Sequence, residues 1–174
     1  MRRTAPITIL ALTCTLLISM ACAVALGPAS ISPGSLVTLP NAWMIIWDVR
    51  LPRVIAAALV GCALAVAGTA MQGLFRNSMA DPYIIGTSSG GALGATLSIV
   101  LFAGTGRPVF AFAGAAIATF AVYIIARQGG KIPVETLLLS GVALSMLLSA
   151  FLSFLMYTAG RSLHQIMFWL MGGF

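Results

Sequence analysis

The sequence is very poor in charged side chains, and acids and histidine are the scarcest of all. Its 174 residues include three acids and one histidine, and only 7% of them are charged, against about 25% in a soluble domain. Metal and redox centres need clusters of such ligands, so we expect no metal site, no cofactor and no catalytic residue. The ATP-binding loop is also missing, because Gly129-Gly130-Lys131 runs on into Ile132 and lacks that loop's earlier glycine.

Cysteine and clustered positive charge are scarce as well. The three cysteines, Cys14, Cys22 and Cys62, lie singly inside apolar stretches without C-x-x-C spacing, which is typical of small packing residues. The net charge of +6 comes from nine Lys and Arg residues that are scattered singly or in pairs. Because they form no basic patch, we expect no nucleic-acid partner.

Apolar length is what the sequence has in abundance. It is 60% hydrophobic, and its mean hydropathy is +1.08. Five uncharged runs each approach the ~20 residues that a helix needs to cross a bilayer. They cover residues 7–26, 54–75, 83–103, 108–126 and 137–157. The sequence therefore predicts an all-α, multi-pass membrane helix bundle of about five spans, with an amphipathic outer segment over residues 162–174.

The first run has two interpretations. Arg2 and Arg3 precede it, and Ala23-Val24-Ala25 resembles the cleavage site of a secretory signal peptide. Its length and the four runs after it favour a membrane span, although removal of residues 1–25 stays open. With both arginines in the cytoplasm, the N-terminus is cytoplasmic and the R-L-P-R segment at residues 50–53 faces outside.

Small residues recur every four positions in three of the runs. In lipid, apolar burial does not drive helices together, so such stripes allow backbones to approach closely. We interpret them as helix-packing positions rather than as ligands. They include Gly61 in the second run, Gly86, Gly90 and Gly94 in the third, and Gly141, Ser145 and Ser149 in the fifth.

Polar residues bracket the second run at both ends. Arg50 and Arg53 precede it, and N-S-M-A-D-P at residues 77–82 follows it. The arginines suit either snorkelling at the interface or bidentate docking of an acidic partner. The second segment is typical of a helix stop and restart, in which Asp81 caps the next helix. Gln72 is a costly polar side chain near membrane depth, which makes it a candidate for the pathway or an interhelix hydrogen bond.

The order of the motifs resembles that of one family. These motifs are R-L-P-R (50–53), M-Q-G-L-F-R-N-S-M-A-D-P-Y-I-I-G (71–86), L-L-L-S-G-V-A-L (137–144) and W-L-M-G-G (169–173). The chain is similar to the FecCD-type permeases, the membrane subunits of ABC importers for iron chelates and cobalamin. It resembles the N-terminal half of such a permease. Ser78 and Met79 depart from the Pro and Leu that the family usually carries there.

The resemblance implies a transporter subunit of the cell (inner) membrane and not an enzyme. A periplasmic or lipid-anchored substrate-binding protein would deliver the substrate, and separate ABC ATPase subunits would bind and hydrolyse ATP. A second permease subunit, identical or different, would complete the pathway. An iron chelate such as a siderophore or haem is expected over cobalamin as cargo. As half of a permease, the chain is expected to confer no uptake alone.

The resemblance also implies roles for individual residues. Arg50 and Arg53 would dock glutamates of the substrate-binding protein on the outer face. Asn77 and Met79 would line the cytoplasmic gate of the translocation pathway. Residues 133–134 fall where the family places a second part of that gate, but they lack the small hydroxyl residues found there.

Two other function classes remain as alternatives. An ion-coupled secondary carrier needs an ionisable residue buried in mid-span, and none of the five runs contains a charge. An intramembrane serine protease would use Ser88, because residues 86–90 fit G-x-S-x-G, together with the one histidine, His164. No strand is predicted before this motif and His164 is expected near the outer surface, so we favour the permease.

Overall fold

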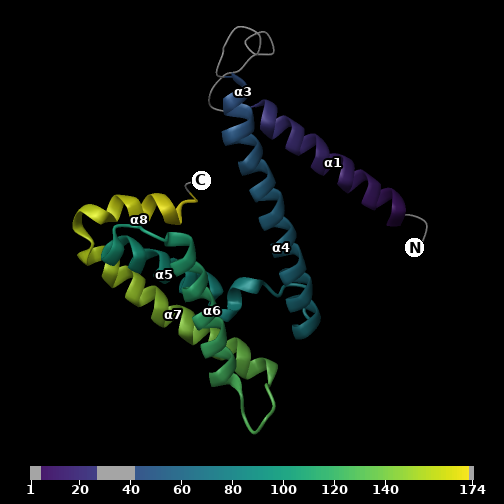
Figure 1. Cartoon of the computed structure of the whole chain (residues 1–174). Coiled ribbons are helices and arrows are strands. Elements are labelled where there is room, and N and C mark those ends of the chain that lie inside the picture. The colour runs from purple at the N-terminus through teal and green to yellow at the C-terminus, as the bar shows by residue number, and fades with distance from the viewer. Residues whose placement is uncertain (1–4, 27–41, 173–174) are drawn as a thin grey trace. The chain divides into compact units, whose positions relative to one another are not determined.

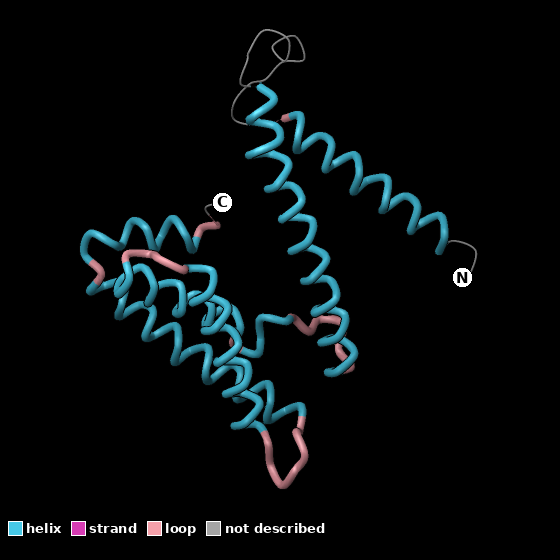
Figure 2. Tube along the Cα trace, in the orientation of Figure 1, coloured by secondary structure: helices cyan, strands magenta, loops and turns pink. Residues whose placement is uncertain are grey.

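The structure, a computed structural model, describes residues 5–26 and 42–172, which consist of helices and the loops between them (Figure 1 and Figure 2). It has two compact units, Met1–Ala63 and Leu64–Phe174, whose boundary lies inside a long helix. The prediction of an all-α membrane helix bundle is confirmed. Arg2 and Arg3, on which the predicted orientation depends, lie outside the described residues, as do the last two residues of the predicted amphipathic segment.

The first unit contains one separate helix and the beginning of a long one. Its elements are α1 (Ala5–Ala25), α3 (Ala42–Met44), the π-helical turn η1 (Ile45–Arg50) and the first part of α4 (Leu51–Phe75). The π turn has a local cause, because Pro52 lacks an N–H and its ring crowds the preceding turn. The N–H of Leu51 accordingly donates to the carbonyl oxygen of Ile46, five residues back.

The arginine pair lies within a helix rather than at its mouth. The sequence predicts a span that begins at residue 54, but the helix is continuous from Ile45 to Phe75, so that predicted start is wrong. The helical register then separates the two arginines. Arg53 is exposed, whereas only 8% of the Arg50 surface is exposed.

Arg50 connects this helix to the end of α1. Its Nη1 donates hydrogen bonds to the carbonyl oxygens of Val24 and Ala25, each at 2.9 Å. These carbonyls belong to the last turn of α1, which has no further N–H of its own to satisfy them. The guanidinium also meets the negative end of the helix dipole. Arg50 therefore caps the C-terminus of α1 from another helix.

The second unit is arranged around a central helix. It contains the rest of α4, the 3₁₀ turn η2 (Pro82–Ile85), α5 (Thr87–Phe102), α6 (Arg107–Ala126), α7 (Val134–Thr158), the turn η3 (Gly160–Ser162) and α8 (Leu163–Leu170). α5 contacts η2, α6, α7 and α8, and it carries more buried positions than any other described helix. It is therefore the helix on which the others of this unit pack.

Four described helices are long and apolar enough to cross a membrane: α1, the helix from Ile45 to Phe75, α6 and α7. The ends of α1, α6 and α7 agree with the predicted spans to within three residues. The predicted continuous span over residues 83–103 is wrong. Gly86, with φ at +81° in the left-handed region, ends η2 and begins α5, which has only 16 residues.

α5 and α6 meet backbone to backbone at three glycines. A Cβ on Gly94 would overlap the carbonyl oxygen of Phe110, and a Cβ on Gly114 would overlap that of Gly90. A Cβ on Gly90 would lie 2.5 Å from the Gly114 carbonyl oxygen and from the Cβ of Ala118. The absence of these side chains permits the close dispersion contacts that hold helices together in lipid.

The other predicted packing positions have different surroundings. Gly141 on α7 approaches the backbone of η2 so closely that a Cβ there would overlap the Ile84 carbonyl oxygen. A Cβ on Gly61 would meet no atom of the described residues within 4 Å, so its packing role stays a prediction. Gly114 was not predicted, although small residues also recur every four positions on α6, at Gly114 and Ala118 and at Ala111, Ala115 and Thr119.

A small apolar core lies where α6 ends and α7 begins. Val122, Ala126 and Leu137 are buried there. Three partly buried side chains from α4, η2 and α7 pack against them: Phe75, Ile85 and Leu144. The end of α4 is thus tied to the turn that follows it by apolar contacts.

We expect Gly94→Ala to destabilise the bundle by about 1–3 kcal/mol, because the added methyl group must displace a rigid backbone carbonyl. Gly61→Ala is the matched control, since the same methyl group meets no atom of the described residues within 4 Å. Its better helix propensity is expected to leave the free energy of unfolding unchanged or up to about 1 kcal/mol higher. Denaturant unfolding of the full chain in micelles measures both variants, and equal effects would contradict close packing at Gly94.

We expect Arg50→Met to loosen the last turn of α1. A charge-assisted hydrogen bond contributes about 1.5–3 kcal/mol, so amide hydrogen exchange across residues 22–26 should accelerate about tenfold or more. Arg53→Met, one turn further along the same helix but exposed, should leave this exchange unchanged. If Arg50→Met leaves it unchanged too, the guanidinium does not cap α1 in solution.

Candidate functional site

The polar segment after α4 begins with a tightly hydrogen-bonded helix end. The N–H of Arg76 donates to the Gly73 carbonyl oxygen at 3.4 Å, and that of Asn77 donates to the Gln72 carbonyl oxygen at 3.2 Å. This pair of bonds is the Schellman arrangement, in which one residue adopts the left-handed conformation. That residue is Arg76, with φ at +48°, where a glycine is usual. α4 is therefore terminated by its own backbone, and the chain turns sharply.

The carboxamide of Asn77 and the carboxylate of Asp81 then stabilise the turn. Asn77 Oδ1 accepts a hydrogen bond from the Met79 N–H at 2.9 Å, and the Ala80 N–H donates to the Asn77 carbonyl oxygen at 3.1 Å. Asp81 Oδ1 accepts from the Tyr83 N–H at 2.8 Å, which caps η2 as the sequence predicts. Each side chain thus binds the backbone two residues further on, as in an Asx turn.

One groove brings two of the predicted pathway residues together. Gln72 on α4 and Met79 at the tip of the turn line a cavity of about 430 Å³, with Asp81 and Tyr83 across from α4. Met79 is 84% exposed, so its flexible thioether chain stands out from the turn. Gln72 is also exposed, and its amide is available to a molecule in this groove.

A second groove runs along α7 on the other side of the same turn residues. Asp81 and Tyr83 line it with Ser145, Met146 and Ser149, and its volume is about 460 Å³. Ser145 and Ser149 were predicted as packing positions only. Their four-residue spacing next to Gly141 places them on one face of α7, and this face is where η2 docks. The structure therefore adds four residues to the predicted site: Asp81, Tyr83, Ser145 and Ser149.

The remaining predicted site residues are not among those that line these grooves. Asn77 lines neither groove, and its side chain instead positions the backbone of Met79. Pro133 and Val134 form the N-terminal end of α7 and are exposed. Arg50 and Arg53 belong to the first compact unit, where Arg50 is engaged with α1 and Arg53 is exposed. Their predicted roles in the gate and in docking stay predictions.

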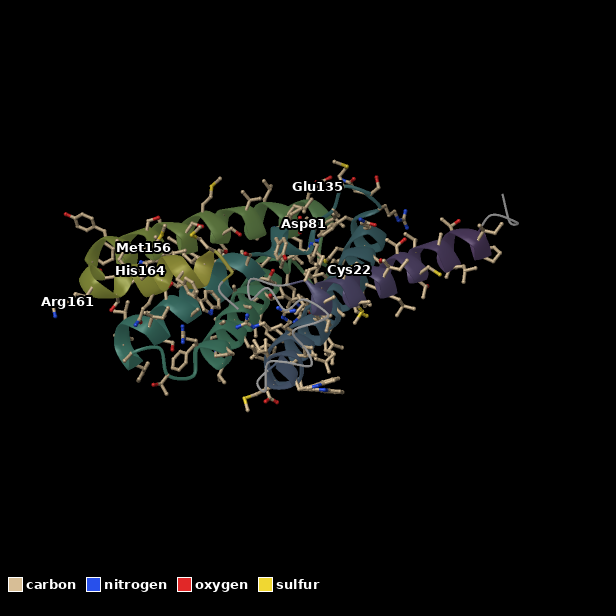
Figure 3. All side chains as sticks on the ribbon, turned by 90° about the horizontal axis from the view of Figure 1, so that it is seen from above. Cys22, Asp81, Glu135, Met156, Arg161 and His164 are labelled. Atoms are coloured by element: carbon tan, nitrogen blue, oxygen red, sulfur yellow. The ribbon has the colours of Figure 1, made fainter. Side chains whose placement is uncertain are left out.

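The serine protease alternative fails on geometry. Ser88 lies in the first turn of α5, whereas His164 shares a cavity with Ala103, just beyond the last residue of α5. Fifteen residues at a rise of ~1.5 Å place the two ends about 20 Å apart. Figure 3 likewise shows His164 at the end of the unit opposite Asp81. In the part of the chain that the structure describes, no three His, Cys, Asp or Glu side chains group as metal ligands either.

Known proteins are similar to this chain over nearly its whole length. Residues 15–174 match the FecCD transport family. The chain is 50% identical over 134 residues to the cobalamin import system permease protein BtuC of Halobacterium salinarum, a match that covers 76% of this chain and 36% of that protein. It is 36% identical over 171 residues to the vitamin B12 import system permease protein BtuC of Escherichia coli, which covers 95% of this chain and 52% of that protein.

The chain thus spans about half the length of the bacterial relative and less of the archaeal one. The family match nevertheless begins in the middle of α1 and continues through α8, so it includes all four sequence motifs. This chain belongs to the FecCD transport family.

Proposed function

We propose that this chain forms part of the translocation pathway of an ABC importer whose cargo is cobalamin. The observation that carries the proposal is the family match over residues 15–174, together with 50% identity to a protein named as a cobalamin import permease. The sequence by itself favours an iron chelate. Both relatives described above are named for cobalamin or vitamin B12, and this favours cobalamin instead.

The two grooves beside the turn suit passage rather than tight binding. They are lined by hydroxyl, amide and thioether groups of Ser145, Gln72 and Met79, with one carboxylate, Asp81, between them. Such groups exchange hydrogen bonds with a polar cargo at little cost, and none fixes it with paired charges. A pathway of this kind leaves selection to the protein that delivers the cargo.

The turn itself has the properties of a gate. The Asn77 and Asp81 side chains accept hydrogen bonds from its backbone N–H groups, so the turn is expected to move as one piece when α4 or α7 tilts. Met79 lies at the tip of the turn. Its flexible apolar side chain can pack against an opposing part of the pathway without needing one particular partner residue. In this proposal, Asn77 positions the backbone of the gate, and the side chain of Met79 closes the pathway.

The partners and location follow from the same proposal. ABC ATPase subunits supply the energy, a periplasmic or lipid-anchored binding protein delivers the cargo, and a second permease subunit completes the pathway. The helices place the chain as a multi-pass protein in a membrane. We assign it to the inner membrane with the N-terminus in the cytoplasm and Arg53 on the outer face.

An ion-coupled carrier is the second candidate, and the buried groups do not favour it. The buried polar side chains of the described residues are Arg50, Thr96 and Ser98. Arg50 is held by carbonyl oxygens of α1, and the Ser98 hydroxyl donates to the Thr105 carbonyl oxygen at 2.8 Å. A proton-coupled carrier uses a buried carboxylate or histidine, and neither is among these three residues.

We expect the two arginines to affect docking differently. Arg53→Glu should weaken capture of the binding protein about tenfold or more, because an exposed guanidinium that pairs with a carboxylate becomes a repelling charge. Arg50→Lys, which keeps the charge next to α1, should weaken capture by less than about threefold. Arg161→Glu, an exposed charge reversal beyond α7, is the matched control. Co-purification with a candidate binding protein measures all three, and an Arg53→Glu chain that captures it normally contradicts this docking role.

The cargo is tested by comparing two binding proteins. In reconstituted membranes, we expect the chain to capture a cobalamin-loaded binding protein at least about tenfold better than a siderophore-loaded one, since docking surfaces are matched by partner. The reverse preference would reinstate iron chelates as the cargo. Capture of neither protein by a stably inserted chain would contradict docking by this chain and reopen the carrier alternative.

A further inference from the structure

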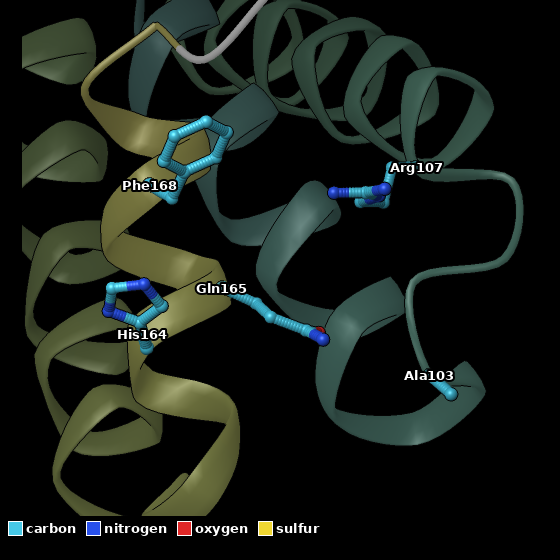
Figure 4. A pocket seen from close by; sticks show the side chains of 5 residues that line it. All are labelled: Ala103, Arg107, His164, Gln165 and Phe168. Carbon is cyan, nitrogen blue, oxygen red and sulfur yellow. The ribbon is translucent and has the colours of Figure 1, made fainter.

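Besides the two grooves, a polar cavity lies at the end of the second unit away from the turn that follows α4. It has a volume of about 350 Å³ and is lined by Ala103, Arg107, His164, Gln165 and Phe168 (Figure 4). Arg107 comes from the first turn of α6, and the last three residues come from α8. None of these residues takes part in the gate or in the docking site proposed above.

The lining of this cavity carries hydrogen-bond donors without an acid. Arg107 Nε donates to the Gly104 carbonyl oxygen at 3.2 Å, and its two terminal nitrogens carry four more donors. His164 and Gln165 add an imidazole and an amide. The chain has only three acids, Asp48, Asp81 and Glu135, and none of them lines the cavity. The uncompensated positive charge therefore favours an anion.

The shape of the turn before α6 directs Arg107 into this position. Ala103, Gly104 and Gly106 all have φ values in the left-handed region, at +51°, +81° and +69°. The hydroxyl of Ser98 fixes the same turn through its bond to the Thr105 carbonyl oxygen. The left-handed conformation is sterically less favourable for Ala103 than it would be for glycine. Backbone hydrogen bonds stabilise the turn on both sides, from the Gly104 N–H to the Ser98 carbonyl oxygen and from the Val109 N–H to the Gly106 carbonyl oxygen, each at 2.9 Å. The cation is thus presented by a defined loop rather than by a free chain end.

Apolar side chains are exposed in the cavity and on the helices that lead to it. Phe168 lines the cavity and is 60% exposed. On the adjoining helices, Phe102 at the end of α5 is 52% exposed, and Val109 and Phe112 at the start of α6 are 70% and 77% exposed. In a membrane, exposed apolar side chains such as these favour contact with acyl chains. A ligand with an anionic head and apolar chains complements both the positively charged cavity and the exposed apolar side chains. A small water-soluble anion complements the cavity alone.

We propose that this cavity binds the phosphate headgroup of an anionic phospholipid from the leaflet at this end of the bundle. Arg107 pairs with the phosphate oxygens, His164 and Gln165 donate to the phosphate or to the headgroup, and the acyl chains run along the exposed apolar side chains of α5 and α6. The lipid holds α8 to the membrane interface beside α6. This proposal does not depend on the cargo or on the docking partner.

Native mass spectrometry of the full chain in micelles tests the proposal. The probes are phosphatidylglycerol and phosphatidylcholine with identical acyl chains. We expect the wild-type chain to bind phosphatidylglycerol at least about fivefold more tightly, in proportion to the contribution of one basic residue near a lipid headgroup. Gln165→Glu, which has nearly the same shape but adds a negative charge to the cavity, should abolish this preference. Gln128→Glu, at the exposed turn between α6 and α7, is the matched control and should keep it.

Additional variants and a competition experiment distinguish a lipid headgroup from a soluble phosphate as the ligand. Arg107→Gln should also abolish the preference, and Arg107→Lys should keep most of it. Retention of the preference in both Gln165→Glu and Arg107→Gln would overturn the site, and so would an equal loss in Gln128→Glu. Glycerol 3-phosphate should not displace the lipid, and displacement at equal concentration would overturn the lipid assignment in favour of a soluble phosphate. Circular dichroism verifies that each variant keeps its helical content.

Discussion

Close contact between the backbones of α5 and α6 is the constraint on which the second unit depends. Water does not drive helices together inside a bilayer, so association rests on contacts that side chains would prevent. Gly94 lies against the Phe110 carbonyl, and Gly90 and Gly114 lie against each other. Because α5 also contacts η2, α7 and α8, its position decides where the turn after α4 and the loop before α6 lie. Both candidate sites are therefore placed by one helix pair.

The turn between α4 and α5, which we propose as the gate, is held in shape without a large core. From Arg76 to Gly86, the left-handed residues end one helix and begin another, and the side chains of Asn77 and Asp81 bind nearby backbone N–H groups. These bonds are local, so they persist when neighbouring helices shift. Apolar contacts of Phe75 and Ile85 with the small core then tie the turn to α6 and α7. The proposed gate can therefore move with the helices and keep its own shape.

The few charged groups are separated along the second unit. Asp81 and Glu135 lie at one end, and His164 and Arg161 lie at the other (Figure 3). Arg50, in the first unit, is turned inward to satisfy the final carbonyls of α1. An ionised group near hydrocarbon is costly unless it is paired or reaches the interface. The same scarcity leaves the cavity beside Arg107 positively charged.

The sequence by itself determined the class of protein, three helical spans to within a few residues, the cap at Asp81 and the family. These depend on apolar length, on turn chemistry and on motifs in order, all of which act over short stretches of chain. It did not determine that Gly94 is tightly packed while Gly61 contacts no other described helix, because both have the same four-residue spacing. It also did not reveal that Arg50 caps α1 while Arg53 is exposed, or that Ser145 and Ser149 share a groove with Asp81. Only the tertiary structure decided these, because each joins residues from separate helices whose distance no local pattern records.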